Sequence, residues 1–120
     1  MKLPNGHRAV IDVGSKLAGY CLNMDHARGR HKARVFQAAL GIAAADPTLL
    51  VKALREAALS TDATFRKSNG YGNEYEIEFP MDGPNGRFVV TSAWFIDRES
   101  DLPRLTNCYV NLTKSRRFPP

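Results

Sequence analysis

The sequence predicts an α+β domain in which two to three N-terminal helices pack on a three- to four-stranded antiparallel β-sheet. Apolar residues recur with helical spacing in the first half of the chain and alternate with polar residues in the second half. The length of 120 residues suits one domain and leaves no room for a second. We therefore expect a single domain over residues 1–113 and a basic, disordered tail over residues 114–120.

The helical half follows a short extended segment over residues 8–13. Ser15 carries a side chain typical of an N-cap, and it predicts a helix over residues 16–22. A second helix is expected over residues 31–40, and Gly41 is the residue that ends it. The first helix is expected to turn three residues inward: Leu17, Tyr20 and Cys21.

A third helix has the clearest boundaries. Asp46 is placed to cap it, Pro47 suits its first position, and the apolar spacing continues to about Ser60. One face of this helix should therefore pack against the sheet. The predicted buried stripe consists of Leu49, Leu50, Ala53, Leu54 and Ala57.

Three strands are predicted after Ser60, with residues 61–71 left as a short strand or a loop. Residues 74–79 alternate, with apolar residues on one face and three glutamates on the other. Residues 88–96 are apolar on both faces, as in a central strand, and residues 104–112 form the last strand. One face of the last strand is expected to carry Thr106, Cys108, Val110 and Leu112, and the other Leu105, Asn107, Tyr109 and Asn111.

Charge is spread unevenly along the chain, whose formal net charge is +5. The first sixty residues hold nine Lys and Arg against four Asp and Glu, whereas the last sixty hold eight of each. A basic half beside a neutral half is typical of one positive face that binds a polyanion. A solvated basic surface without a ligand is the alternative, and charge alone does not separate the two.

Several classes of protein are excluded by what the sequence lacks. No stretch approaches the roughly 18 apolar residues of a membrane span, and the N-terminus lacks the apolar core of a signal peptide. We therefore expect a cytoplasmic protein that does not contact membranes. No phosphate-binding loop, dinucleotide fingerprint or nucleophile elbow is present, so we expect no cofactor.

The two cysteines, Cys21 and Cys108, are too few for a disulfide framework or a zinc site. Two small buried thiols are the expected state, and a single disulfide between them stays open. The His, Cys, Asp and Glu residues show no recognised ligand spacing, so no metal site is expected.

The densest functional feature is the segment 26–34, which packs two histidines and four permanent cations around a glycine. Where a loop runs into a helix N-terminus, side-chain cations and free backbone N–H groups lie together, and both suit phosphate. Arg28, Arg30 and Arg34 are the candidate substrate-binding residues, because arginine can form two parallel hydrogen bonds to phosphate. A basic loop that is merely solvated is the alternative.

The same segment holds candidates for acid–base chemistry. Cleaving RNA without metal needs a base for the 2′-hydroxyl, an acid for the leaving 5′ oxygen and a cation for the charged phosphorane. His26 and His31 are the candidate acid and base, since imidazole titrates near neutral pH. Lys32, which begins the apolar face of its helix, is the candidate cation. It must either extend past the helix end into solvent or point into a cleft beside the sheet.

The last predicted strand supplies further candidates. Tyr109 is expected to join the catalytic group, and Thr106 or Asn107 would help it to orient the phosphate. A solvent-facing surface is the common alternative for polar residues on a strand. His7, in the opening turn, is expected to be exposed and without a catalytic role.

Several short motifs are spread over nearly all of residues 3–110. They are LPNG at residues 3–6, KL and YCLN within residues 16–23, RHKARVF at residues 30–36, GPNGR at residues 83–87 and AWFI at residues 93–96. In these motifs the chain resembles an uncharacterised bacterial domain family, which occurs as small free-standing proteins and as C-terminal domains of polymorphic toxins.

The layout is also similar to the superfold shared by barnase, EndoU-type nucleases, colicin ribonucleases and RelE-type toxins. This resemblance implies RNA bound between the helices and the sheet, with His or Lys from the helices and Thr or Ser plus Tyr from the last strands. His26, His31 and Lys32 match the first group, and Tyr109 matches the second. Asn107 stands where the second group has threonine, although a threonine precedes it. The analogy holds at the level of fold.

These observations lead to the prediction of a metal-independent, RNA-cleaving domain of bacterial toxin type. Its expected partners are RNA and a protein antitoxin or immunity protein. A non-catalytic RNA- or protein-binding module on the same scaffold is the alternative. A third reading is that the chain is itself an immunity protein, against which the net charge of +5 argues where the cognate toxin is basic.

Overall fold

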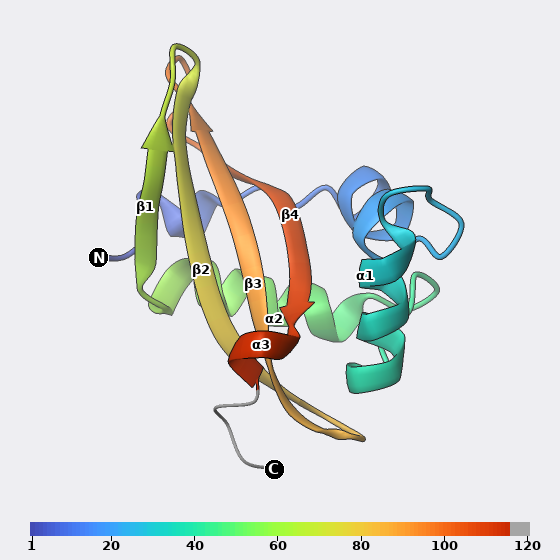
Figure 1. Cartoon of the computed structure of the whole chain (residues 1–120). Helices are drawn as coiled ribbons and strands as arrows, with labels where there is room; N and C mark the ends of the chain where they lie inside the picture. The colour runs from blue at the N-terminus through green and yellow to red at the C-terminus, as the bar shows by residue number, and fades with distance from the viewer. Residues whose placement is uncertain (116–120) are drawn as a thin grey trace.

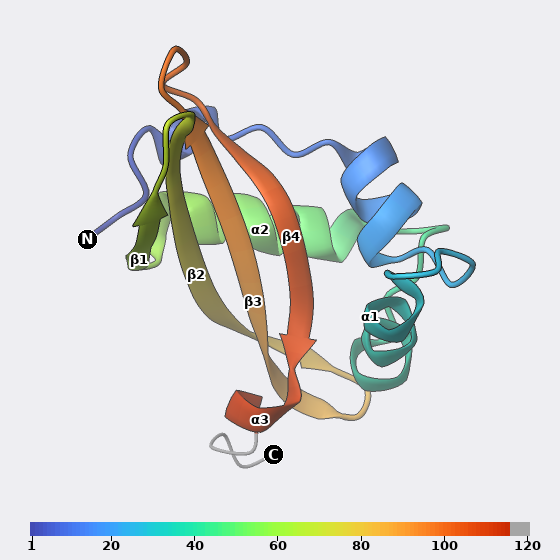
Figure 2. The same cartoon turned by 45° about the horizontal axis from the view of Figure 1, so that its top comes forward.

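The computed structural model describes residues 1–115. A four-stranded antiparallel sheet forms one layer, and the helix α2 (Thr48–Ser60) lies across one of its faces (Figure 1). The helices η2 (Val13–Cys21) and α1 (Arg30–Val35) lie beside the edge strand β4 (Pro103–Asn111) in both views (Figure 2). This arrangement confirms the predicted α+β class. The elements in chain order are η1 (Gly6–Arg8), η2 (Val13–Cys21), α1 (Arg30–Val35), η3 (Phe36–Leu40), α2 (Thr48–Ser60), β1 (Ala63–Ser68), β2 (Gly72–Gly83), β3 (Gly86–Asp97), β4 (Pro103–Asn111) and α3 (Leu112–Ser115).

The sheet is a simple meander. Its order is β1-β2-β3-β4, so each strand pairs with its neighbours in sequence. The register places Glu78 opposite Thr91, and Thr91 opposite Tyr109. These three residues therefore form one row across three strands. The segment 61–71, which the sequence left open, supplies the edge strand β1.

The core lies between α2 and the sheet. The alternation predicted for residues 74–79 is confirmed, because the three apolar residues of this segment are buried while its glutamates are partly exposed. Trp94 is fully buried, and its indole N–H donates to the Ser92 hydroxyl at 2.9 Å. Ser92 in turn donates to the carbonyl oxygen of Ile77 at 2.9 Å, so these buried polar groups are paired.

The capping prediction for α2 is wrong in its register: Pro47, predicted at the first helical position, is the N-cap, and Asp46, predicted as the cap, lies one residue before it. The side chain of Asp46 nevertheless binds the first residue of the helix. Asp46 Oδ1 accepts hydrogen bonds from the hydroxyl and the backbone N–H of Thr48, at 2.7 and 3.2 Å, and these bonds lower the pKa of Asp46. The buried stripe is wrong at Leu49, which is 67% exposed. Leu50 and Leu54 face the core, and Leu49 lies about 100° around the helix from Leu50.

The first two N-terminal helices differ from prediction at their starts. Asp12 is the N-cap of η2, and Ser15 is not, because Asp12 Oδ1 accepts the backbone N–H of Ser15 at 2.9 Å. This hydrogen bond is the main reason that the pKa of Asp12 lies below its ordinary value. The second predicted helix begins as α1, widens into η3 and ends at Gly41. The φ of 69° at Gly41 is the left-handed conformation expected of a residue that ends a helix.

The extended segment before η2 joins the outer edge of β4. The backbone N–H of Val10 donates to the Pro103 carbonyl at 2.8 Å, and the Val10 carbonyl accepts the N–H of Leu105 at 2.9 Å. This parallel bridge holds the N-terminal half of the chain to the last strand of the sheet.

The last strand contains a bulge. Trp94 pairs with Leu105 and Ala93 pairs with Asn107, which leaves Thr106 as an extra residue. Leu105 is therefore buried in the core, and the predicted division of this strand into two alternating faces is wrong at this point. The Thr106 hydroxyl donates to the Ala93 carbonyl at 3.2 Å.

The described chain continues past β4 into α3, so the start predicted for the tail, residue 114, is wrong. Lys114 forms an ion pair with Glu78, and Ser115 is buried with its hydroxyl bound to a backbone N–H of β3. Leu112, expected at the end of the strand, is the first residue of α3 and is exposed. The rest of the predicted tail, residues 116–120, lies outside the described residues.

Candidate functional site

Lys32 extends from α1 between a tyrosine of η2 and a tyrosine of β4. Its Nζ atom donates to the Tyr20 hydroxyl at 3.0 Å and lies 4.9 Å from the centre of the Tyr20 ring. The centre of the Tyr109 ring lies 5.9 Å from the same atom. Of the two orientations open to this lysine, the structure has the one that points toward the sheet. We call the group of Tyr20, Lys32 and Tyr109 the Lys32 site.

Among the described residues, no carboxylate neutralises the charge of Lys32. Within residues 1–115, no Asp or Glu oxygen lies within 4.0 Å of its Nζ atom. One of the three N–H bonds of the ammonium is used by Tyr20, which leaves two for a ligand. The face of an aromatic ring attracts a cation without cancelling its charge. The site therefore holds a cation whose charge stays available to an anion.

The close approach of α1 to η2 depends on Gly29, which directly precedes α1. A Cβ atom at this position would lie 2.2 Å from the carbonyl oxygen of Tyr20. Any other residue would therefore push the start of α1 away from Tyr20, because a backbone atom cannot move aside as a side chain can. The glycine at the centre of the basic segment thus sets the distance between the Lys32 helix and its tyrosine partner.

His26 acts as a cap for the turn that leads into α1. Its Nδ1 atom accepts hydrogen bonds from the backbone N–H groups of Arg28 and Gly29, both at 3.0 Å. Its ring packs edge-on against Tyr20, with centres 4.9 Å apart. Because Nδ1 is an acceptor, the neutral ring carries its proton on Nε2. His26 is next to the Lys32 site, but one of its two nitrogens is occupied by the backbone.

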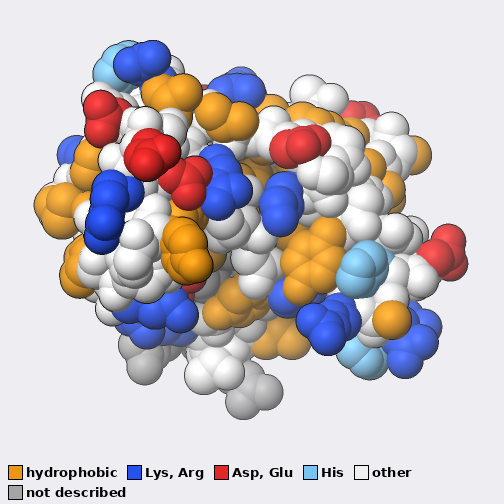
Figure 3. Space-filling model, turned by 90° about the horizontal axis from the view of Figure 1, so that it is seen from above, with side chains coloured by type: hydrophobic (Ala, Val, Ile, Leu, Met, Phe, Trp, Pro, Cys, Tyr) orange, Lys and Arg blue, Asp and Glu red, His pale blue; other side chains and the backbone are white. Residues whose placement is uncertain are grey.

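The remaining predicted cations surround this site on the surface. Arg28, Arg30 and Arg34 are exposed, and none of them forms an ion pair within the described chain. Lys, Arg and His side chains gather at the end of the molecule that carries α1 (Figure 3). His31 is exposed as well, and no hydrogen bond or ring contact joins it to His26 within residues 1–115.

The three candidates on β4 have different surroundings. Tyr109 lies beside Lys32, as described above. The side-chain oxygen of Asn107 accepts a hydrogen bond from the Cys21 thiol at 3.7 Å, and the Thr106 hydroxyl is bound to the backbone of β3. The structure therefore brings Tyr109 to Lys32, while the other two side chains are engaged elsewhere.

The two cysteines, Cys21 in η2 and Cys108 in β4, are free and fully buried, as the sequence predicted. A hydrogen bond from Cys108 is the largest effect on Cys21 and lowers its pKa, against the opposing effect of burial. The same contact, together with burial, raises the pKa of Cys108 well above the ordinary range of a thiol.

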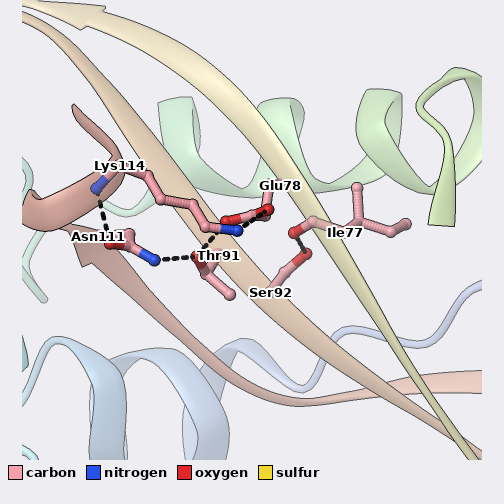
Figure 4. A network of polar contacts seen from close by, with 6 residues as sticks. All are labelled: Ile77, Glu78, Thr91, Ser92, Asn111 and Lys114. Atoms are coloured by element: carbon pink, nitrogen blue, oxygen red, sulfur yellow. Dashed lines mark hydrogen bonds and ion pairs between the residues drawn. The ribbon is translucent and has the colours of Figure 1, made fainter. Parts of the chain in front are cut away.

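A second polar cluster lies on the sheet face opposite α2 and was not anticipated from the sequence (Figure 4). Glu78 binds the ammonium of Lys114 and accepts a hydrogen bond from the Thr91 hydroxyl at 3.4 Å. Asn111 donates to Thr91 at 3.2 Å and accepts the backbone N–H of Lys114 at 3.1 Å. Since Thr91 is the register partner of Tyr109, this cluster adjoins the Lys32 site.

Sequence reasoning missed Tyr20 and Glu78 for different reasons. Tyr20 was expected to be an inward-facing residue of its helix, and only the packing of η2 beside α1 reveals its contact with Lys32. Glu78 belongs to a row of alternating glutamates that resembles a solvated strand face. The strand alternation places it on the same face as Thr91 and Tyr109 only once the register is known.

A shallow groove of about 430 Å³ opens one helical turn along α1 from Lys32. Its walls are mainly apolar, and Arg34 and Asn85 contribute polar groups at its rim. Seven residues line it: Arg34, Val35, Ala38, Ala39, Asn85, Phe88 and Leu112.

Comparison with known proteins places this site within a family. Residues 2–112 match a family described as a domain of unknown function, DUF6883. The chain belongs to this family. Tyr20, Lys32 and Tyr109 all lie within the matched part of the DUF6883 domain, whose description assigns it no activity. No curated protein matches the sequence, and no solved structure matches it either.

The described part of the DUF6883 domain has neither a metal-binding cluster nor a membrane-spanning helix. Residues 1–115 contain no group of three or more His, Cys, Asp and Glu side chains arranged to hold a metal ion. None of the helices in the described part of the chain is long and apolar enough to span a bilayer.

Proposed function

We propose that this DUF6883 domain binds RNA through the sugar–phosphate backbone, with one phosphate received at Lys32. The observation that carries the proposal is the un-neutralised ammonium of Lys32, held by the Tyr20 hydroxyl at 3.0 Å. Two free N–H donors and a charge partly shielded from water suit an anionic oxygen. The tyrosine contacts fix the direction of the donors before the ligand arrives, so less side-chain entropy is lost on binding.

The surface around Lys32 supports a run of phosphates rather than a single anion. Arg28, Arg30 and Arg34 are exposed and unpaired in the described chain, and each can bind a phosphate with two hydrogen bonds. Such contacts position a nucleic acid without reading its sequence. RNA rather than DNA is the class that the resemblance to toxin-type ribonucleases implies.

Metal-independent cleavage of the bound RNA is the second candidate function, as in a toxin-type ribonuclease. The placement of Lys32 between two tyrosine rings favours it, because a fixed cation could stabilise the charged phosphorane. Acid–base catalysis would require His26 to release its backbone hydrogen bonds, or His31 to act from an exposed position. Because RNA binding has neither of these requirements, we propose it as the first function and cleavage as the second.

The test is incubation of the purified domain with total RNA, transfer RNA and DNA of matched length in the presence of EDTA. A shifted band without fragments supports binding alone, and discrete fragments support cleavage. Lys32→Ala should weaken RNA binding by roughly 10-fold or more, the effect of losing a charged hydrogen bond. Lys52→Ala removes an exposed lysine from α2 and serves as the control of equal charge. Equal affinities of the two variants would contradict the proposal.

A protein antitoxin or immunity partner remains a prediction of the same resemblance. A basic surface of this kind would take an acidic partner, which would compete with RNA for it. Adding RNA to a complex with such a partner would then release the domain, whereas a partner bound on another face would leave the RNA-binding surface free.

A further inference from the structure

The groove of about 430 Å³ beside α1 adjoins the Lys32 site along two segments of the chain. Val35, which lines the groove, lies one helical turn after Lys32 on the same side of α1. Leu112, which also lines it, follows Tyr109 by three residues at the end of β4. One turn of helix advances about 5.4 Å, a distance that a single nucleotide spans between its phosphate and its base.

The turn between β2 and β3 supplies another part of the lining, and it lies at the end of the α1–η3 helix in both views (Figures 1 and 2). The Asn85 side-chain amide donates to the carbonyl oxygen of Ala38 in η3, which fixes the turn against the helix. Within residues 1–115 the Asn85 side chain forms no other hydrogen bond, so its carbonyl oxygen and second N–H can bind a ligand.

The composition of the groove combines apolar surface with a few polar groups. Phe88 presents an aromatic ring that is only partly buried. Arg34 is the one charged side chain among the seven lining residues, and it forms no ion pair within the described chain. Nucleobases stack on aromatic and apolar side chains through their faces and form hydrogen bonds to amides and guanidinium groups through their edges. The groove offers both kinds of contact.

We propose that this groove receives one unpaired base of the RNA whose phosphate is bound at Lys32, so that the domain prefers single-stranded to duplex RNA. The proposal rests on the proposed function and adds to it the form of RNA that the site takes. The base lies against Phe88, and its edge faces Asn85 and Arg34. In a duplex each base face is covered by its neighbours, so only an unpaired base can enter.

The experiment measures the affinity of the domain for a short RNA strand, alone and annealed to its complement, by fluorescence anisotropy at fixed salt in EDTA. The strands are 2′-O-methyl RNA, which cannot be cleaved through its 2′-hydroxyl. We expect the single strand to bind tighter by roughly 5-fold or more, the effect of stacking one base on an aromatic side chain. Binding through the backbone alone would favour the duplex, which carries more charge per unit length.

Ala38→Leu fills the groove, because Ala38 is an exposed residue of its lining. This variant should lose the preference for the single strand and keep its affinity for inorganic polyphosphate, which has no bases. Gln37→Leu is the matched control, since Gln37 is the exposed neighbour of Ala38 and does not line the groove. Phe88→Leu removes the ring, keeps an apolar side chain and should also weaken binding of the single strand.

The outcomes separate this inference from the proposed function. Equal affinity of the wild-type protein for the two RNA forms, or an unchanged preference in both Ala38→Leu and Phe88→Leu, would overturn the base site and leave backbone binding intact. The same loss in Gln37→Leu as in Ala38→Leu would also contradict it. A wild-type protein that binds neither form of RNA would overturn both proposals. Occupation of the groove by an apolar peptide segment instead would leave RNA binding unchanged in Ala38→Leu.

Discussion

The ammonium of Lys32 is bound to the hydroxyl of Tyr20, which belongs to a different helix, at a distance of 3.0 Å. This contact links α1 to η2 at the edge of the sheet. It also restrains a side chain that would otherwise lose much rotational freedom on binding a ligand. The Tyr20 hydroxyl is therefore expected to contribute to ligand affinity without touching the ligand.

Tyr20→Phe tests this contribution, because it removes the hydroxyl and keeps the ring. We expect RNA affinity to fall by about 2- to 10-fold, the range of one hydrogen bond. Filter binding at fixed salt is a suitable measurement. Tyr71→Phe is the matched control, since Tyr71 is 80% exposed and lies outside the Lys32 site. If RNA affinity fell equally in both variants, the Tyr20 hydroxyl would have no specific role in RNA binding.

The salt dependence of RNA binding reports the number of phosphates engaged. Changing Arg30, Lys32 and Arg34 together to alanine should flatten the slope of log affinity against log salt by up to about three units. The reason is that each phosphate contact releases counterions from the RNA. A titration from low to physiological salt gives the slope. If the triple variant keeps the wild-type slope, the basic segment does not contact the phosphates.

His26 has two assigned roles that substitutions can separate. If His26 is a cap, His26→Ala should lower the free energy of unfolding by about 1 kcal/mol. His26→Asn should retain most of the wild-type stability, because asparagine can accept the same hydrogen bonds. If His26 is also a catalytic group, both variants should cleave RNA more slowly than the wild-type protein, by roughly 10²- to 10⁴-fold. Denaturant unfolding and a cleavage assay measure the two effects. His7→Ala serves as the control in both.

Gly29→Ala tests the close approach of α1 to η2. The added methyl group would meet the Tyr20 carbonyl oxygen, so we expect a loss of about 1–3 kcal/mol in stability together with weaker RNA binding. Gly70→Ala is the control, because a Cβ atom at Gly70 would have nothing within 4 Å. A Gly29→Ala protein as stable as the Gly70→Ala protein would show that the helix shifts without penalty.

The parts of the fold that were predicted correctly are those governed by residues close in sequence. The alternation of residues 74–79 depends on neighbours within a few positions, as does the ending of a helix at Gly41. The bulge at Thr106 could not be predicted in this way, because it depends on which residues of β3 lie opposite. The partner of Lys114 depends in the same way on the sheet register.

In the candidate site, too, some residues could be predicted from the sequence and others could not. Lys32 and Tyr109 stand out in the sequence because a lysine on an apolar helix face and a tyrosine on a strand are chemically conspicuous. Tyr20 does not stand out, since its role arises only when two helices pack. His26 was assigned its role from its residue type, and its backbone hydrogen bonds depend on the conformation of a turn.

The parallel bridge between Val10 and β4 has a consequence for the order of folding. Within the sheet, each of the four strands pairs with its neighbours in sequence, so the strands can form as successive hairpins. Val10 pairs instead with residues 103–105, which lie more than ninety positions away in the sequence. Closing so long a loop carries a large entropic penalty, so we expect the N-terminal half to dock on a sheet that already exists. The Lys32 site combines Tyr20 and Lys32 from the N-terminal half with Tyr109 from β4, so it forms only when the two parts have docked. It should be the last part of the domain to assemble and the first to be lost when the chain begins to open.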